Sequence, residues 1–573
     1  METRNLILAI VLSVGVLLLW TVLIEAPRQQ INQSIELSQQ DSIGEVTELA
    51  TEELNLIEED LGIKKQSFET LENSLQSSAR VNIDTQSLEG SINLKGLKID
   101  DVVLKKYQET LDKDSSTIRL LSPINTEDGY ELTFGWLKDK NATFEIPTSD
   151  SEWRLISASN TLRDNSQLDF EWSNTTGQIY RTSISVDENY LFSINQKIIN
   201  KSDQEIVVNN ASQIARKKAP TLSGMFILHE GLIGVLNEEL EHVDYDNLKD
   251  DGETLNFESE NGWVGITDKY WLAALIPDQT QPFKAIYNYD NAYKAYYRSL
   301  NAQSIKAGEE FEVNSKVFIG AKEAKLIDQY QEDFNIYNFD LAIDWGMFYF
   351  LTKPLFYIIY YFSGISGNFG LAIIILTVIT RIIFFPLANW SFVSMAKMKM
   401  LQPEMTRIKE LHKEDRQQQQ KALMDLYKKE KVNPISGCLP ILIQIPFFFA
   451  IYKMLFVSIE MRHAPFYGWI QDLAAKDPTT IFNLFGLIPW DPPSFMIIGV
   501  WPVLMGITMY LQQKLNPAPP DPIQAKIFMF FPLFITILLA QFAAGLVIYW
   551  TTNNILSIIQ QWIITRRTTV KTN

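Results

Sequence analysis

The sequence predicts a multi-domain membrane protein, in which a six-helix transmembrane bundle carries one large antiparallel β-sandwich outside the cytoplasm. Two observations predict this class. Apolar residues gather into separate runs, one at residues 6–24 and several more between residues 369 and 564. Between them lies a long polar stretch rich in Asp, Glu and turn residues, and the mean hydropathy of the whole chain is close to zero.

The composition excludes several other classes of protein. A net charge of −18 argues against specific binding of nucleic acid. The single cysteine, Cys438, excludes an internal disulfide framework. The four histidines have no cysteine neighbours at metal-binding spacing, so we expect neither a metal site nor another cofactor. They are His229, His242, His412 and His463.

The first apolar run predicts an N-terminal transmembrane anchor at residues 1–24. A cleaved signal peptide is the alternative, but the segment after the run has no small-residue cleavage site, and the run exceeds the usual length of a signal core. Residues 25–55 are rich in Gln, Ser and Glu, which is typical of a flexible tether.

Residues 56–330 show the pattern of an antiparallel β-sandwich. Segments 130–136, 152–156 and 182–198 alternate or cluster β-branched and aromatic residues, and Asp-Gly and Asn-rich turns separate such segments. Long helical periods are rare here, so we expect two packed sheets.

Residues 331–364 predict a linker followed by an amphipathic helix on the outer membrane surface. Aromatic residues are dense between Trp345 and Phe362, and aromatic side chains favour the membrane–water interface. The alternative is a complete span, but Lys353 and Pro354 leave only short apolar stretches on either side.

Five further spans are expected within a core at residues 365–567. Several are shorter than the roughly 20 residues that match a normal bilayer, which would thin the membrane around them or limit their tilt. The expected spans are residues 369–388, 438–456, 495–511, 527–542 and 545–564.

Basic residues predict the orientation of the chain. The loop at residues 391–433 carries ten Lys and Arg, whereas the loop at residues 458–494 carries two. Because short cytoplasmic loops are enriched in Lys and Arg, the first loop and the tail at residues 568–573 should face the cytoplasm. Both termini are then cytoplasmic and the acidic domain lies on the opposite side.

Arg381 is the most informative residue, because it lies within the apolar run that begins at Phe369. A central Arg opposes membrane insertion by about 2.5–3.5 kcal/mol, so it normally faces a partner or a wet cavity. The six runs contain no Asp or Glu, which favours a hydrated groove. The alternative is an Arg that snorkels to the cytoplasmic surface, since Pro386 ends its helix soon after.

Other polar residues of the spans can line the same groove. Thr377 is one turn before Arg381, and Gln444 lies in the middle of the third span. In the last span, Trp550, Asn554 and Ser557 share one helix face. Each of these could instead form a hydrogen bond between helices.

The cytoplasmic loop at residues 391–433 predicts a basic helical hairpin. Its apolar residues recur at helical spacing and include Met398, Met405 and Leu423. Methionine-rich faces adapt to varied partners, so these residues are candidate contacts. Packing of the two helices on each other explains the same pattern equally well.

Several motifs then resemble one known family in their order along the chain. They are Gly367-Asn368-Phe369-Gly370 with Arg381, Met398-Lys399-Met400-Leu401-Gln402-Pro403, Lys431-Val432-Asn433-Pro434 with Gln444-Ile445-Pro446, Arg462-His463-Ala464-Pro465-Phe466 with Asp477-Pro478, and Gly545-Leu546-Val547-Ile548-Tyr549-Trp550 with Asn554. Together they resemble the YidC/Oxa/Alb family of membrane insertases, in its Gram-negative form with a large periplasmic domain.

This resemblance implies a non-enzymatic insertase and chaperone of the bacterial inner membrane, with Arg381 as the essential cation of its groove. The implied partners are nascent inner-membrane proteins, the Sec translocon, the ribosome and the phospholipid bilayer. Two alternatives are a small-solute channel or transporter and a membrane-anchored periplasmic protein that binds or modifies sugars. A transporter would be favoured by an intramembrane carboxylate, and a sugar-modifying protein would need a clustered acid–base set. The sequence shows neither feature.

Overall fold

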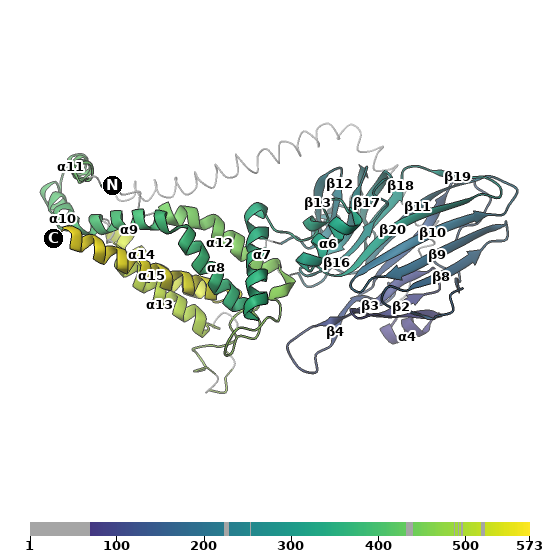
Figure 1. The fold of residues 1–573 in the computed structure, drawn as a ribbon, viewed down its shortest axis with the longest axis horizontal. Coiled ribbons are helices and arrows are strands. Elements are labelled where there is room, and N and C mark those ends of the chain that lie inside the picture. The colour runs from purple at the N-terminus through teal and green to yellow at the C-terminus, as the bar shows by residue number, and fades with distance from the viewer. Residues whose placement is uncertain are drawn as a thin grey trace.

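The computed structural model describes residues 69–222, 228–252, 254–430, 432, 439–485, 488–490, 492–493, 497–516 and 522–572. Within these ranges the chain forms a helical bundle and a β-sandwich, and helix α7 (Tyr349–Ser366) stands between them (Figure 1). The expected anchor at residues 1–24 and tether at residues 25–55 lie outside the described residues.

The sandwich consists, in the described part of the chain, of an eleven-stranded and a nine-stranded sheet. The first sheet contains β1 (Arg80–Asp84), β2 (Leu88–Asn93), β3 (Lys98–Gln108), β4 (Thr117–Leu121), β5 (Tyr130–Lys138), β7 (Thr161–Leu162), β11 (Ile206–Arg216), β14 (Leu255–Ser259), β17 (Phe283–Tyr289), β18 (Tyr293–Ser299) and β19 (Gln303–Ile305). The second contains β6 (Arg154–Leu155), β8 (Gln167–Ser173), β9 (Gln178–Val186), β10 (Leu191–Asn200), β12 (Gly231–Leu236), β13 (Glu239–Asp244), β15 (Gly262–Thr267), β16 (Trp271–Ile276) and β20 (Glu310–Ala321).

Strand pairing follows the expected antiparallel pattern. In the register of the central pair β10–β20, for example, Leu191 lies opposite Phe318. Only the short pair β1–β7 is parallel among the described pairings. Buried and partly exposed residues alternate along β9 and β10, because one face of the sheet packs on the core. The predicted sheet-rich outer domain is therefore confirmed.

Helices form the rest of the described chain. Short ones accompany the sandwich: α4 (Leu71–Gln76), α5 (Tyr245–Asp251), α6 (Ala324–Phe334) and the 3-10 turn η2 (Phe339–Ala342). After α7 come α8 (Phe369–Ile383), α9 (Phe385–Met400), α10 (Gln402–Leu411), α11 (Arg416–Lys429), α12 (Leu439–Val457), the turn η4 (Ile459–Met461), α13 (Val500–Leu515), α14 (Pro522–Leu539) and α15 (Ala544–Thr572).

The first expected core span, residues 369–388, is wrong as a single helix. Helix α8 ends at Ile383 and α9 begins at Phe385, with a bend of 67° between them. Pro386 sits in the first turn of α9, where its missing N–H is tolerated, but it could not donate to a continuing α8. Among the described helices, none alone has the length and apolarity of a span, although α8 and α9 reach that threshold as a bent pair.

Helix α7 lies within the segment expected to hold an amphipathic helix and runs through Pro354. Two other boundaries differ from those expected. The hairpin expected from residue 391 begins later, because Ser391 to Met400 belong to α9, where Phe392 and Met395 pack on Ile564 of α15. The last helix continues to Thr572 and includes most of the expected tail. The count of six spans stays a prediction.

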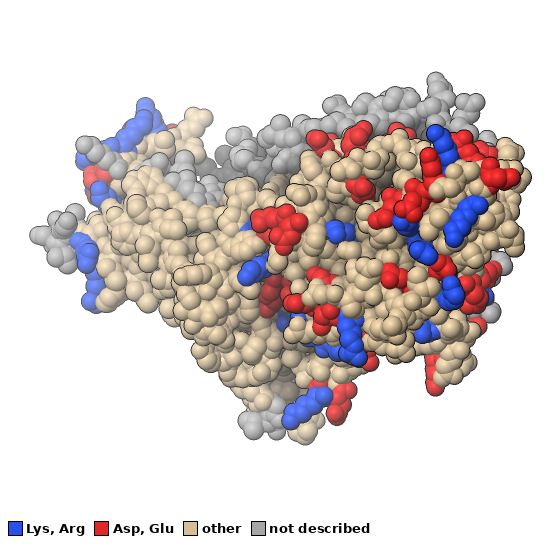
Figure 2. Space-filling model, turned by 45° about the vertical axis from the view of Figure 1, so that its right-hand side comes forward, with Lys and Arg blue, Asp and Glu red and all other residues tan. Residues whose placement is uncertain are grey.

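The sandwich and the helical bundle differ in how many charged side chains their surfaces carry. Figure 2 shows them gathered over the sandwich and again at the far end of the bundle, whereas the bundle surface between carries few. Large apolar side chains are exposed on this surface, for example Phe530 (60%) and Phe534 (62%) of α14. A surface of this kind suits contact with lipid rather than water.

The sandwich is joined to the bundle by charged contacts. Lys453 of α12 forms an ion pair with Asp344, with 2.7 Å between Nζ and Oδ2. Glu460, in the turn after α12, accepts a hydrogen bond of 2.9 Å from the backbone N of Ala324, the first residue of α6. Lys269 of the sandwich lies 3.7 Å from the ring centre of Phe456.

Glu460 makes this junction sensitive to pH. Burial raises the pKa of its carboxyl from 4.5 to about 7, and one of its oxygens has no hydrogen-bond partner among the described atoms. A raised folded-state pKa means that stability is full below pH 4.5 and falls as pH rises through about 7. At about 1.4 kcal/mol per pKa unit, the free energy of unfolding falls by about 3 kcal/mol in total.

We therefore expect Glu460→Gln to raise the thermal unfolding temperature at pH 8 and to leave it nearly unchanged at pH 5. The amide keeps an oxygen for the Ala324 N–H and carries no charge to desolvate. Unfolding scans of the detergent-purified protein between pH 5 and 8 would measure this. Equal pH slopes in the wild type and the variant would show that Glu460 is ionised or hydrated in the folded state.

Candidate functional site

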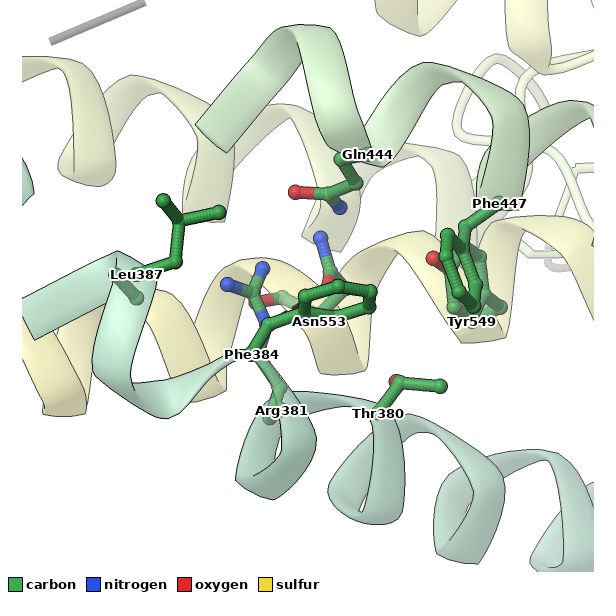
Figure 3. Close-up of a pocket in the computed structure, with 9 residues that line it drawn as sticks. Thr380, Arg381, Phe384, Leu387, Gln444, Phe447, Tyr549 and Asn553 are labelled. Atoms are coloured by element: carbon green, nitrogen blue, oxygen red, sulfur yellow. Dashed lines mark hydrogen bonds between the residues drawn. The ribbon is translucent and has the colours of Figure 1, made fainter. Parts of the chain in front are cut away.

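A pocket inside the bundle surrounds Arg381. About 450 Å³ of space, partly open to the surroundings, lies between α8, α9, α12 and α15. Figure 3 shows Arg381 rising from α8 towards Asn553 of α15, with Gln444 of α12 on the opposite wall. The lining residues are Thr380, Arg381, Phe384, Leu387, Ala388, Gln444, Phe447, Tyr549 and Asn553.

Arg381 is held by uncharged oxygens. Its Nε donates a 2.9 Å hydrogen bond to Oδ1 of Asn553, and its Nη2 donates a 3.2 Å bond to the backbone oxygen of the same residue. Asn553 is 7% exposed, whereas Arg381 is half-buried. No carboxylate is among the described side chains that line the pocket. The guanidinium therefore keeps its positive charge in a largely apolar enclosure.

The break between α8 and α9 shapes the pocket. Phe384 sits at the break, its N–H donates to the carbonyl of Thr380 at 3.0 Å, and its ring meets Phe447 of α12 edge-on at 4.9 Å. Because the chain turns by 67° at this point, Leu387 of α9 faces the same space as Arg381 of α8. A straight helix would have carried these two residues apart.

The structure brings only two of the expected groove residues, Arg381 and Gln444, into this pocket. Thr377 is fully buried and donates to the carbonyl of Ile373 at 2.7 Å. Trp550 meets the ring of Phe448, with 4.8 Å between centroids.

Two further expected residues, both on α15, also lie outside the pocket. Asn554 donates to the hydroxyl of Thr508 on α13 at 3.3 Å, and Ser557 donates to the carbonyl of Asn553 at 2.7 Å. The contacts of Thr377, Trp550, Asn554 and Ser557 are therefore within or between helices.

Asn553, Tyr549 and Thr380 line the pocket but were not selected from the sequence. Tyr549 and Asn553 are four residues apart and therefore share a helix face. This face is next to the one that carries Trp550 and Asn554. Neighbouring residues of a helix differ by about 100° in direction, and both faces are polar, so the sequence contains no signal that chooses between them.

The three expected hairpin contacts lie on three different helices. Met398 of α9 and Leu423 of α11 are partly exposed. Met405 of α10 is 7% exposed, and its sulfur accepts a hydrogen bond from the hydroxyl of Tyr427 at 3.8 Å. At Met405 the apolar face therefore packs within the hairpin. Leu411 and Met424, by contrast, are 73% and 52% exposed.

The histidines of the sandwich form a stacked pair. The rings of His229 and His242 lie 4.3 Å apart, and the two ring nitrogens of His229 contact Asp244 and the carbonyl of Leu232. Burial lowers the pKa of His242 to about 4. In the described ranges, no group of three or more His, Cys, Asp or Glu residues is arranged to hold a metal ion.

Comparison with known proteins finds matches along most of the chain. The family model "60Kd inner membrane protein" matches residues 361–571, and the model "YidC periplasmic domain" matches residues 80–358. A membrane protein insertase YidC from Pelagibacter ubique is 48% identical over the whole of both chains. One from Rickettsia conorii is 46% identical over 98% of this chain and 99% of that chain. A crystal structure of an active YidC insertase aligns with 90% of this chain and 98% of that one, at 17% identity and a TM-score of 0.36.

Proposed function

This chain belongs to the YidC family of membrane protein insertases, and from that membership we propose that it inserts its substrates by way of the pocket around Arg381. The chain is an inner-membrane insertase with a sheet-rich periplasmic domain, and it is not an enzyme. The geometry of the pocket supports the mechanism: Arg381 is half-buried between four helices, and no carboxylate is among the described side chains that line the pocket.

The first step is entry of a short polar tail of the substrate into the pocket from the cytoplasmic side. The polar groups of Arg381, Gln444 and Asn553 replace part of the water that the tail leaves behind, which lowers its desolvation penalty. Arg381 attracts acidic residues of the tail, and the membrane potential assists the transfer of negative charge.

The second step is release of the apolar helix of the substrate into lipid. Ile382 and Ile383 of α8 are 67% and 65% exposed, and Ile555 and Ile559 of α15 are 44% and 50% exposed. An apolar helix can slide along these surfaces while its tail is held near Arg381. Burial in lipid gains about 25 cal/mol per Å² of apolar area, which drives the reaction without a cofactor.

The topology and partners complete the proposal. Both termini and the hairpin lie in the cytoplasm, because Lys and Arg gather in the hairpin and at the end of α15. Residue 431 and residues 433–438, which complete the hairpin-to-span motif, lie outside the described residues. The clients are nascent inner-membrane proteins, delivered by the ribosome alone or with the Sec translocon.

We expect the exposed apolar residues of the hairpin to contact these partners. Photocrosslinking probes at Leu411 and Met424 should capture the ribosome, the translocon or the nascent chain during synthesis, because these side chains are open to solvent. A probe at the buried Met405 should capture mainly this chain and serves as the matched control. If all three probes captured only this chain, the hairpin would be a structural brace.

The proposed function is tested with the purified protein alone in liposomes. It should insert a small single-span protein with a short acidic tail, without other proteins or nucleotides. Leakage of small solutes without insertion would favour the channel alternative. Insertion only when the Sec translocon is added would reduce its role to that of an assisting chaperone.

A further inference from the structure

Asn553 gives Arg381 an unusual environment for a half-buried cation inside a helical bundle. A buried arginine commonly pairs with a carboxylate, and the pair is then neutral. Here both acceptors belong to one uncharged residue, at 2.9 Å and 3.2 Å from the guanidinium nitrogens. The position of the cation is therefore fixed while its charge stays available.

The contact also determines the direction of the guanidinium. Arginine has five N–H donors, and the contact with Asn553 uses Nε and Nη2. Figure 3 shows the terminal nitrogens turned into the space between Leu387, Gln444 and Asn553. Ser557 donates to the same backbone oxygen that accepts from Nη2, so this acceptor is fixed within α15.

We propose that Asn553 is a positioning residue that sets the substrate selectivity of the insertase: it orients Arg381 towards the incoming tail without neutralising it, and so favours acidic tails. The inference rests on the proposed function, because it requires that tails enter this pocket. The shape of Asn is nearly that of Asp, so one substitution changes the charge of the partner and little else.

The experiment measures liposome insertion by the full chain, at matched protein levels, of one single-span substrate whose tail carries zero, one, two or three acidic residues. Asn553→Asp should lower insertion of the most acidic tail about tenfold and that of the uncharged tail less than about twofold, since the new carboxylate neutralises Arg381. Asn553→Ala keeps the charge but frees the side chain, so the acidic tail should lose about threefold. The matched control is Asn554→Asp, which adds the same charge one residue away, beside Thr508 and outside the pocket.

Each outcome decides between the two claims. If the wild type inserts none of the tails, the proposed function fails and the inference fails with it. If the wild type inserts all tails equally well, the electrostatic role of Arg381 is ruled out and the inference is overturned while insertion stands. If the wild type is charge-dependent but Asn553→Asp lowers all tails equally, Asn553 is only structural and the inference alone is overturned. The same holds if Asn554→Asp changes the charge dependence as strongly as Asn553→Asp.

Discussion

Arg381→Ala should reduce insertion of substrates with acidic tails by about ten- to a hundredfold, since a hydrogen bond to a charged group is worth about 1.5–3 kcal/mol. Substrates with uncharged tails should lose much less, because the pocket offers them polar groups that remain in the variant. Arg381→Lys should retain part of the activity, because the ammonium keeps the positive charge but cannot make both of the contacts that the guanidinium makes with Asn553. The measurement is an insertion assay across a series of tail charges at matched protein levels.

A positive charge introduced at a neighbouring position tests whether Arg381 acts through its charge or through the shape of its side chain. Thr380 lines the same pocket as Arg381, so Thr380→Lys should partly restore insertion of acidic tails by Arg381→Ala. Thr377 lies one turn before Arg381, so helical spacing predicts that it lines the same groove. In the structure it is fully buried and its hydroxyl donates to the carbonyl of Ile373. Thr377→Lys should therefore fail to rescue and provides the control.

The competing role for Arg381 is to orient its own helix by snorkelling to the lipid surface. In that case Arg381→Ala would lower the amount or change the topology of the protein itself. Its effect on insertion per molecule would then be the same for every tail. A flat response across the series would rule out the electrostatic role.

Two residues that line the candidate pocket, Arg381 and Gln444, are predictable from the sequence, whereas the other lining residues are not. Arg381 and Gln444 were predicted because polar groups in apolar runs are expensive and therefore informative. Asn553 was visible as well, but the last helix is polar on adjacent faces. Only the packing of α15 against α8 decides which face meets the arginine.

The fold shows the same division between local and tertiary information. Alternation and turn residues predicted the sandwich, because its strands bury one face each. The bend after Ile383 is not predictable from hydropathy, since the apolar run continues to Ala388, and Pro386 indicates a helix end but not the 67° turn into α9. Helix ends depend on such single residues, which window averages conceal.

Asp477→Ala should destabilise the protein by about 3 kcal/mol or more, because it removes a buried hub of hydrogen bonds. The carboxylate is 2% exposed. Its Oδ1 accepts from the indole N–H of Trp469 at 3.1 Å and from the hydroxyl of Thr479 at 2.7 Å. Its Oδ2 accepts from the backbone N of Trp501 at 3.0 Å, in the first turn of α13.

This contact gives the Asp477-Pro478 motif of the outer loop a physical role. Helix α13 begins after Gly499, which has no side chain to cap it. Asp477 supplies the missing acceptor from the loop, and Thr479 accepts from the N–H of Val500 at 3.0 Å. A carboxylate at a helix N-terminus also interacts favourably with the helix dipole. The loop therefore holds in place a helix that packs on α14 and α15.

The effect should appear as a large drop in thermal unfolding temperature and in the amount of folded protein in membranes. Asp477→Asn should be intermediate, because the amide keeps one acceptor oxygen and loses the other. Asp472→Ala, in the same loop, is the matched control: its carboxylate accepts from the N–H of Ala474 and is only partly buried, so we expect a loss of about 1 kcal/mol. Equal losses in Asp477→Ala and Asp472→Ala would mean that α13 does not depend on this cap. A drop confined to Asp477→Ala, with unchanged charge selectivity in the molecules that still fold, would separate the stability of the bundle from the electrostatics of its pocket.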